Sequence, residues 1–168
     1  VGSLPEWAAG QGAMGGMIAR EGRSDRVLKD ACAGSSGAVE VTGAVEAQRL
    51  LNVNLFGPVR VNRAVLPYMR RQGGGRIVHI SSVAAAAALP FQAYYSATKS
   101  AINAYSLALA NEVRPFGIEV CAVQPGDIRT GFTAARKKLQ RGDDVYAGRI
   151  ARSVARMETD EQTGMQPE

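Results

Sequence analysis

Short apolar runs, separated by longer segments of helical periodicity, dominate the middle of the chain. Two of these runs, Arg76 to Ile80 and Ile118 to Val123, are continuous and rich in β-branched residues, which predicts strands. Residues Ser24 to Leu28 are a third, shorter strand candidate. Strands that are continuously apolar, and not alternating with polar residues, are typical of a parallel sheet covered on both faces.

Helices are expected between and after these strands. Apolar residues recur at three- and four-residue intervals from about Ala44 to Arg71 and from Tyr94 to Arg114. Gly57–Pro58 is expected to bend or break the first helix, because proline has no N–H and clashes with the preceding turn. Three glycines at 73–75 should end it. The basic stretch from Arg136 to Arg156 predicts a further helix, and the acidic residues after it show little pattern.

This order of elements predicts an α/β fold with a parallel sheet. Such sheets bind ligands beyond the carboxyl ends of their strands. We expect one domain over residues 1–168, with a poorly patterned segment at 1–21, a core at 22–132, and a helical region at 133–168 that covers the substrate.

Composition is that of a globular protein that resides in the cytoplasm. Hydrophobic residues make up 46% of the 168 residues and charged residues 21%. No apolar run approaches the roughly 20 residues that cross a bilayer, and the first residues, Val1 to Ala19, do not resemble a signal peptide. Two cysteines, Cys32 and Cys121, make no disulfide framework, and Cys121 is expected to be a buried apolar side chain.

The net charge of +5 has two interpretations. Basic residues cluster between Arg129 and Arg156, which fits an anionic partner such as nucleic acid or a solvated helix face. We favour the solvated face, since the aromatic residues and motifs of nucleic-acid binders are absent from the sequence. The single histidine, His79, lies on a predicted strand and fits a hydrogen-bonded core residue better than a metal ligand, because a metal needs several ligands.

Candidate chemistry lies where the predicted strands end. Ser82 follows the strand that ends at Ile80, and Tyr95 and Lys99 lie one turn apart on the next helix. A phenol titrates near 10, and a neighbouring cation would move its pKa toward the working range of an acid or base. The Ser82 hydroxyl could stabilise charge that develops on a substrate oxygen. Taken singly, the Tyr–Lys pair fits a surface tyrosine beside a solvated lysine better than a catalytic pair.

Four motifs in order identify a family. Tyr95-Ser96-Ala97-Thr98-Lys99 and Gly75 to Ser82 resemble the catalytic helix and serine strand of the short-chain dehydrogenases/reductases. Leu51 to Gly57 resembles the family's Asn-containing helix, and Pro125-Gly126 with Thr130 resembles its nicotinamide loop. Ser82 precedes Tyr95 by 13 residues, as in the family.

The resemblance implies a Rossmann-like, doubly wound parallel sheet in three layers, an NAD or NADP cofactor, and a role for each matching residue. Tyr95 would be the general acid/base, Ser82 would position the substrate oxygen, and Lys99 would lower the tyrosine pKa and hold the nicotinamide ribose. Asn54 would hold a water that relays protons to Lys99; it also fits an amide that satisfies backbone groups freed near Pro58. The residues implied to contact the nicotinamide end are Pro125, Gly126, Ile128 and Thr130.

The chain departs from the family at both ends. Gly10 to Gly15 spells G-x-G-x-x-G, but no strand leads into it, so we assign it no pyrophosphate role. The first three strands, and the last, are expected to be missing. Lys29 to Cys32 aligns with the family's Asn-Asn-Ala-Gly at its alanine alone and is given no cofactor role.

Two functions are consistent with these residues. The first is an oxidoreductase that interconverts an alcohol and a carbonyl on a small apolar substrate, with Leu89, Phe91 and Phe132 near the mouth of the site. The alternative is a truncated, catalytically inactive relative that folds or associates without turnover. The resemblance also implies a homodimer through the helices at 44–71 and 94–114, with no nucleic-acid or membrane partner. NAD and NADP are not distinguished.

Overall fold

Three parallel strands form the main sheet. The structure is a computed structural model that describes Gly16 and residues 25–29, 32–139 and 141–166. The sheet order is β1 (Arg26–Lys29), β3 (Gly75–Ile80), β4 (Ile118–Val123), with β3 in the centre. The predicted α/β fold with parallel strands is therefore confirmed, each strand lying within two residues of its predicted bounds. β1 is paired along one edge only in the described part of the chain.

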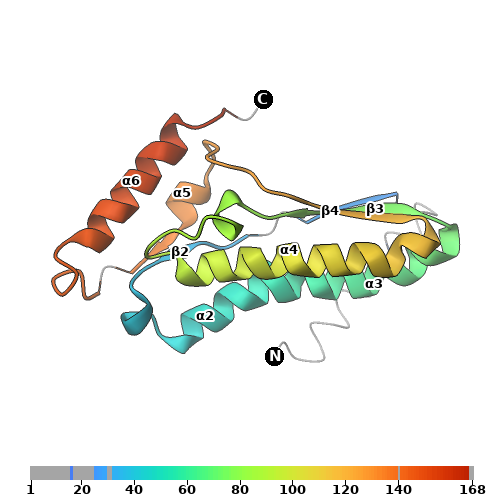
Figure 1. Cartoon of the computed structure of the whole chain (residues 1–168), viewed down its shortest axis with the longest axis horizontal. Helices are drawn as coiled ribbons and strands as arrows, with labels where there is room; N and C mark the ends of the chain where they lie inside the picture. Colours follow the sequence, from blue (N-terminus) through green and yellow to red (C-terminus); the bar gives the residue numbers. More distant parts are fainter. Residues whose placement is uncertain (1–15, 17–24, 30–31, 140, 167–168) are drawn as a thin grey trace.

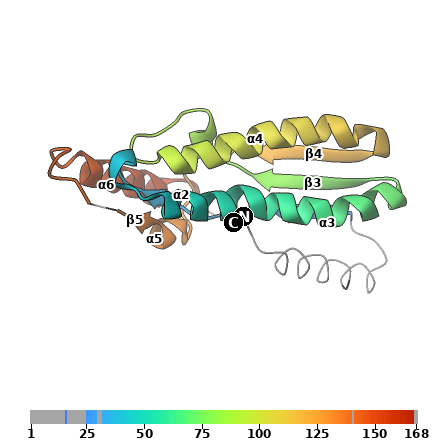
Figure 2. The same ribbon diagram turned by 90° about the horizontal axis from the view of Figure 1, so that it is seen from below.

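One face of this sheet is covered by long helices (Figures 1 and 2). The first helical path consists of α2 (Ala44–Leu51), the π-helical segment η2 (Asn52–Phe56) and α3 (Gly57–Gln72), and the second is α4 (Ala93–Val113). Short 3-10 turns, η1 (Val39–Val41), η3 (Val83–Ala85) and η4 (Arg114–Phe116), connect the elements. None of the described helices has the length and apolar character needed to span a bilayer. Association through the two long helices stays a prediction.

The π-helical segment explains how the first path passes Pro58 without breaking. Pro58 lies in the first turn of α3, directly after the π-helical segment, which is closed by a hydrogen bond from Gly57 N to Asn52 O. The expected bend at Gly57–Pro58 thus takes the form of a wider turn just before the proline, and the path continues to Gln72. Gly73 ends it with a left-handed backbone (φ 81°), as the glycine run predicts.

The core lies between the sheet and these helices. Its buried side chains are Val27, Val65, Met69, Ile77, Leu109, Val113 and Ile118. Burial of each large apolar side chain contributes roughly 1.5–3 kcal/mol. Gly75 permits the close approach of helix and strand, because a Cβ there would meet Met69 Sδ at 2.7 Å. The sheet and α3 are therefore held together where the helix ends and β3 begins.

The opposite face of the sheet corrects a prediction from the sequence. Exposure alternates along the strands: Val27 and Ile118 are buried, whereas Leu28 is 64% exposed and Val123 is 46% exposed. Cys121 is also exposed, so its predicted burial is wrong. The reason is geometric, since residues two apart on a strand share a face and α3 and α4 cover only one face.

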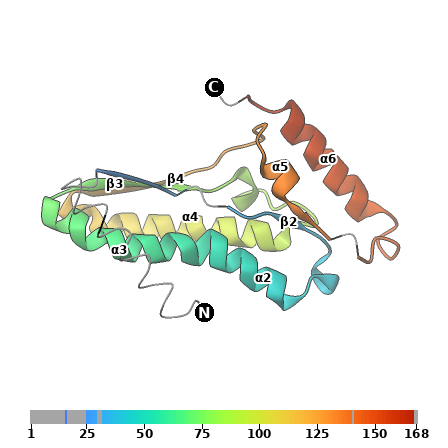
Figure 3. The same ribbon diagram turned by 180° about the vertical axis from the view of Figure 1, so that it is seen from behind.

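The C-terminal region differs from the predicted helix over Arg136 to Arg156. A short helix α5 (Phe132–Ala135) is followed by β5 (Lys137–Lys138), which pairs in parallel with β2 (Ser35–Ser36). Helix α6 begins only at Arg149 and continues to Thr163, through the acidic residues that showed little pattern. Figure 3 shows α5 and α6 beyond the end of the main sheet.

Backbone geometry explains the late start of α6. Gly142 and Gly148 have positive φ values of 80° and 72°, which interrupt any helix. Asp143 Oδ1 then accepts hydrogen bonds from the N–H groups of Ile150 (2.8 Å) and Ala151 (3.3 Å), and so caps the new helix.

His79 is a hydrogen-bonded core residue, as the sequence predicts. Its Nδ1 lies 2.7 Å from Ser106 Oγ, whose own proton goes to the Ile102 carbonyl at 2.6 Å. His79 Nε2 lies 2.9 Å from Asn62 Nδ2, which donates to it. Nδ1 therefore carries the proton, and the neutral ring is satisfied on both sides. Among the described residues no group of side chains could hold a metal ion.

We expect stability to fall in mild acid because of His79. Burial, and then the charge of Lys29, lower its pKa from 6.5 to about 4. The unfolded chain therefore binds this proton more tightly than the folded chain. The free energy of unfolding is at its full value above pH 6.5, and it falls by roughly 3 kcal/mol as the pH is lowered toward 4. Urea unfolding followed by circular dichroism from pH 7 to 4 measures it. His79→Gln should flatten this part of the profile; an unchanged slope in that variant contradicts the assignment.

Candidate active site

A cavity of about 480 Å³ lies at the carboxyl ends of β3 and β4. Figure 2 shows both strands directed toward the end of the molecule that holds α5 and α6. The wall of the cavity includes seven of the eight site residues predicted from the sequence: Ser82, Tyr95, Lys99, Pro125, Gly126, Ile128 and Thr130. Asn54 is the exception and lies behind the wall.

Tyr95 is buried in this wall, at the start of α4. Two polar side chains, Ser82 and Cys32, lie near enough to act on its phenol. Burial raises the pKa of Tyr95 well above its ordinary value, and the neighbouring Cys32 thiol raises it further. The Ser82 hydroxyl and the charge of Arg136 act in the opposite direction. The phenol is thus neutral at pH 7 and holds a proton that it can donate.

Ser82 is placed by the turn that follows β3. Its Oγ accepts a hydrogen bond from the Ala84 N–H at 3.1 Å and thereby caps η3. The backbone on either side is fixed against β4 and its loop, since Ser81 N donates to Val123 O (2.7 Å) and Val83 N donates to Pro125 O (3.0 Å). The serine therefore stands on a rigid edge opposite Tyr95.

Lys99 lies one turn after Tyr95 and reaches the same cavity. Its Nζ donates to the Ile80 carbonyl at 2.8 Å and lies 5.7 Å from the centre of the Tyr95 ring. The side chain is buried, and the charge of Arg136 lowers the Tyr95 pKa. The expected influence of Lys99 on the tyrosine stays a prediction.

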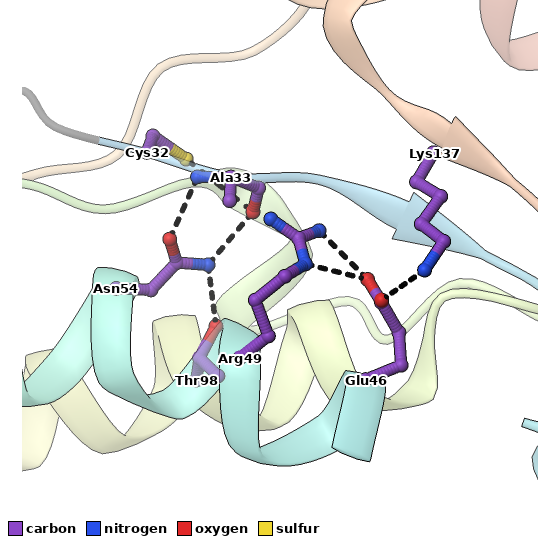
Figure 4. Close-up of polar contacts among 7 residues, drawn as sticks. All are labelled: Cys32, Ala33, Glu46, Arg49, Asn54, Thr98 and Lys137. Atoms are coloured by element: carbon purple, nitrogen blue, oxygen red, sulfur yellow. Dashed lines mark hydrogen bonds and ion pairs between the residues drawn. The ribbon is translucent and has the colours of Figure 1, made fainter. Parts of the chain in front are cut away.

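Asn54 joins three elements behind the cavity (Figure 4). Its Oδ1 accepts from Ala33 N at 2.8 Å, and its Nδ2 donates to Ala33 O at 2.9 Å and to Thr98 Oγ1 at 3.1 Å. The amide thus fixes the loop after β1 to the helix that carries Tyr95 and Lys99. It does not satisfy backbone groups near Pro58, and the water relay implied by the resemblance stays a prediction.

The loop after β4 forms the other side of the cavity. Thr130 Oγ1 accepts from the Phe132 N–H at 3.2 Å, at the start of α5. Asp127 O accepts from Met165 N at 3.0 Å, and Arg129 N donates to Met165 O at 2.9 Å, so the segment after α6 is attached beside the loop. A Cβ on Gly164 would come within 2.3 Å of Asp127 O, which shows how closely the two segments approach.

The sequence did not reveal a buried ion pair in the wall of this cavity. Arg136 was predicted to lie on a solvated helix, but it is 5% exposed and pairs with Glu161 of α6. Thr133 Oγ1 donates to the other carboxylate oxygen of Glu161 at 2.5 Å. The Phe132 ring lies 5.4 Å from Arg136 Cζ and 5.8 Å from the Tyr95 ring. The burial of Arg136 depends on its pairing with α6, an element far along the chain, so no local sequence pattern could show it.

Charged contacts also fix β5 below the cavity. Lys137 Nζ donates to Glu46 at 2.6 Å, and Arg49 donates to the other oxygen of the same carboxylate at 2.7 Å (Figure 4). The hydrogen bond from Arg49 is the main reason why the pKa of Glu46 is lowered. Because Glu46 belongs to α2, this contact holds the segment that carries Arg136 against the first helical path.

The described residues fit the nicotinamide end of a dinucleotide. The predicted contacts Pro125, Gly126, Ile128 and Thr130 line the cavity, and a Cβ on Gly126 would meet nothing within 4 Å, which leaves its backbone open. Gly10 to Gly15, Asp30 and Ala31 lie outside the described residues.

Comparison with known proteins identifies the relatives. The family described as short chain dehydrogenase matches residues 6–141. The chain is 42% identical over 153 residues to 3-ketodihydrosphingosine reductase of Bacteroides thetaiotaomicron, covering 90% of the chain and 57% of the relative. It is 36% identical over 112 residues to human 17-beta-hydroxysteroid dehydrogenase type 1, covering 67% of the chain and 34% of that protein.

A solved structure supports the same assignment. NAD+-bound xylitol dehydrogenase superimposes with a TM-score of 0.72 at 30% identity, over 75% of this chain and 49% of that one. The chain therefore spans between 34% and 57% of the length of these relatives. The match from residue 6 onward, together with the parallel sheet and the cavity at its carboxyl edge, shows that the chain belongs to the short-chain dehydrogenase/reductase family.

Proposed function

We propose that this chain interconverts a ketone and an alcohol, with NAD or NADP as cofactor and Tyr95 as the proton donor. One observation carries the proposal: Tyr95, Ser82 and Lys99 line the same cavity, where the Ser82 hydroxyl acts on the pKa of the Tyr95 phenol. Proton donor, oxygen-positioning hydroxyl and cation thus come together at one sheet edge, where parallel sheets bind ligands.

The proton chemistry follows from the environment of Tyr95. Because burial raises its pKa, the phenol is protonated at pH 7 and acts as a general acid in the direction of reduction. The substrate oxygen lies between the Tyr95 and Ser82 hydroxyls, and both donate to it as negative charge develops. A bound nicotinamide supplies the hydride. Residues Pro125, Gly126, Ile128 and Thr130 would hold its ring, and Lys99 would hold its ribose and return a proton to Tyr95, regaining its own proton from solvent.

The walls of the cavity favour an apolar substrate. Leu89, Pro90, Phe132 and Met157 line it from three different segments. Two relatives are named for a keto sphingoid base and a hydroxysteroid, both of which carry large apolar groups. We therefore take 3-ketodihydrosphingosine as the first substrate to test.

Titration of the chain with NADH and with NADPH tests the cofactor part of the proposal. Quenching of tyrosine and tryptophan fluorescence, checked by calorimetry, should saturate for at least one cofactor. Oxidation of that cofactor, measured as the loss of its absorbance, should then depend on the presence of 3-ketodihydrosphingosine. If neither cofactor binds up to millimolar concentration, the chain does not catalyse the reaction. The alternative, a catalytically inactive relative, then replaces this proposal.

A further inference from the structure

An uncharged loop borders the mouth of the cavity. Residues 83–90 consist of a valine, five alanines, a leucine and a proline, without one polar side chain. Val83 and Leu89 line the cavity, and they are also 47% and 41% exposed. A side chain that both lines a cavity and is open to solvent lies at its mouth. Because residues 86–90 are all exposed, the mouth is bordered here by apolar surface that no described residue covers.

Further exposed apolar surface lies next to this loop. The Phe91 ring, which follows the loop, packs edge-on against the Tyr146 ring, with the ring centres 5.6 Å apart. This contact places the turn before α6 beside the loop, and Val145 in that turn is 74% exposed. Arg149 Cζ lies 5.9 Å from the centre of the same Phe91 ring. A tyrosine beside exposed aliphatic side chains is typical of protein surfaces at the level of lipid headgroups.

Helix α6 adds positive charge beside the apolar loop. Figure 1 shows α6 at the end of the molecule where α4 begins. Ser153 Oγ donates to the Pro90 carbonyl at 3.4 Å, so this face of α6 adjoins the end of the loop. Arg149, Arg152 and Arg156 follow one another at intervals of three and four residues, lie on the same helix face and are exposed. The apolar loop and this cationic face therefore form one surface around the mouth.

Two of these cations have no anionic partner among the described residues. Arg156 is paired with Asp160 at 2.9 Å, whereas Arg149 and Arg152 form no ion pair in the described part of the chain. The basic stretch also contains three cations that are each paired with a glutamate: Arg136, Lys137 and Lys138. Free positive charge next to exposed apolar side chains matches a partner that presents anionic groups above hydrocarbon.

We propose that the mouth of the cavity docks on an anionic lipid bilayer, with the loop at 83–90 against the acyl chains and Arg149 and Arg152 at the lipid phosphates. The resemblance to the family implies no membrane partner, so this surface is a property of the chain that its motifs do not contain. A nucleic acid offers phosphates but no hydrocarbon for the loop, and is therefore the less favoured partner. The inference holds whether or not the chain turns over a substrate.

Co-sedimentation of the full chain with lipid vesicles, in the absence of cofactor, tests the inference. Binding is compared between vesicles of phosphatidylcholine alone and vesicles that also contain phosphatidylserine. The chain should bind the vesicles with phosphatidylserine about tenfold more tightly, the effect of two arginines at an anionic surface. Raising the salt concentration should weaken this binding, because salt screens charges at the bilayer surface.

The contribution of the loop is tested by Leu89→Asp. This substitution removes an apolar contact and adds a negative charge at the mouth, so binding to the anionic vesicles should weaken by about tenfold or more. The matched control is Leu107→Asp, which makes the same change at a leucine of α4 that is 71% exposed and does not line the cavity. The control should bind within about threefold of the wild type.

The contribution of the charges is tested by Arg149→Gln with Arg152→Gln. This double variant should lose most of the preference for phosphatidylserine. Its control is Arg70→Gln with Arg71→Gln, which removes two exposed cations from the last turn of α3 and lowers the net charge equally. That control should keep the preference. Circular dichroism establishes that all four variants fold.

Three results would overturn the inference: no preference for phosphatidylserine vesicles in the wild type, losses in the control variants as large as those at the mouth, or binding of a short DNA duplex at least as tight as that of the anionic vesicles. The last result would assign Arg149 and Arg152 to a nucleic acid. Failure of the proposed function is judged separately, by cofactor binding and turnover. A chain that turns over ketones without docking would keep the proposed function and lose this inference.

Discussion

Replacing Tyr95 with phenylalanine should lower kcat by about a thousandfold and leave the Kd for the cofactor within about twofold of the wild-type value. The substitution removes one oxygen atom and keeps the ring, which packs against Phe132. Because the hydroxyl is the proposed proton donor, loss of it would remove the acid in the transition state and not the shape of the cavity. Steady-state kinetics at saturating cofactor, together with fluorescence titration, measure the two effects separately.

Tyr94 is the matched control for this experiment. It precedes Tyr95 on α4, is partly exposed, and does not line the cavity. Tyr94→Phe should therefore leave kcat within about twofold of wild type. Equal losses in kcat and in cofactor affinity for Tyr95→Phe would show that Tyr95 is structural, and a comparable loss in Tyr94→Phe would show that the effect is not specific to the cavity.

Asn54→Ala should destabilise the fold by about 4 kcal/mol, with a corresponding loss of activity. The side chain makes three hydrogen bonds, two of them to the backbone of Ala33. Truncation leaves that N–H and carbonyl, together with the Thr98 hydroxyl, short of partners in a buried site. Unfolding in guanidinium chloride, followed by circular dichroism, gives the change in free energy.

Asn111 provides the comparison. It also lies on a helix and its amide bonds the backbone, donating to Leu107 O at 3.2 Å, but it is exposed. Asn111→Ala should change the free energy of unfolding by no more than about 0.5 kcal/mol. If Asn54→Ala costs less than about 1 kcal/mol, the loop at Ala33 does not depend on this amide, and the role of Asn54 must be sought in a bound water instead.

The fold was predictable from the sequence wherever local pattern and tertiary packing agree. β4 has the predicted bounds, and α4 differs by one residue at each end. The predicted helix over Arg136 to Arg156 was wrong because basic residues with helical spacing do not show where a glycine adopts a positive φ. The predicted burial of Cys121 failed for another reason: a continuous apolar strand does not reveal that, in the described part of the chain, α3 and α4 cover only one of its faces.

The residues of the candidate site were likewise predictable where they belong to local sequence motifs. Ser82, Tyr95 and Lys99 follow from residue type and from their place after a strand and at the start of a helix, and all three line the cavity. Cys32 and Arg136, which also act on the tyrosine, reach it from segments far apart in the chain. Their participation depends on the pairing of β2 with β5 and on the placement of α6, and single-sequence patterns contain neither.

The wide turn at Asn52–Phe56 sets the rotational phase between the two halves of the first helical path. A π turn completes the same rotation as an α turn with one residue more, so deletion of one residue there would restore regular helix and keep the phase, whereas a deletion within α2 or α3 would swing one half by about 100°. After a deletion at the π turn, Leu50, now fully enclosed, would still face the interior that Val65 faces. A change in length by one residue is therefore accommodated in this segment and not elsewhere along the path, and homologues that differ in length by one residue should have the gap here.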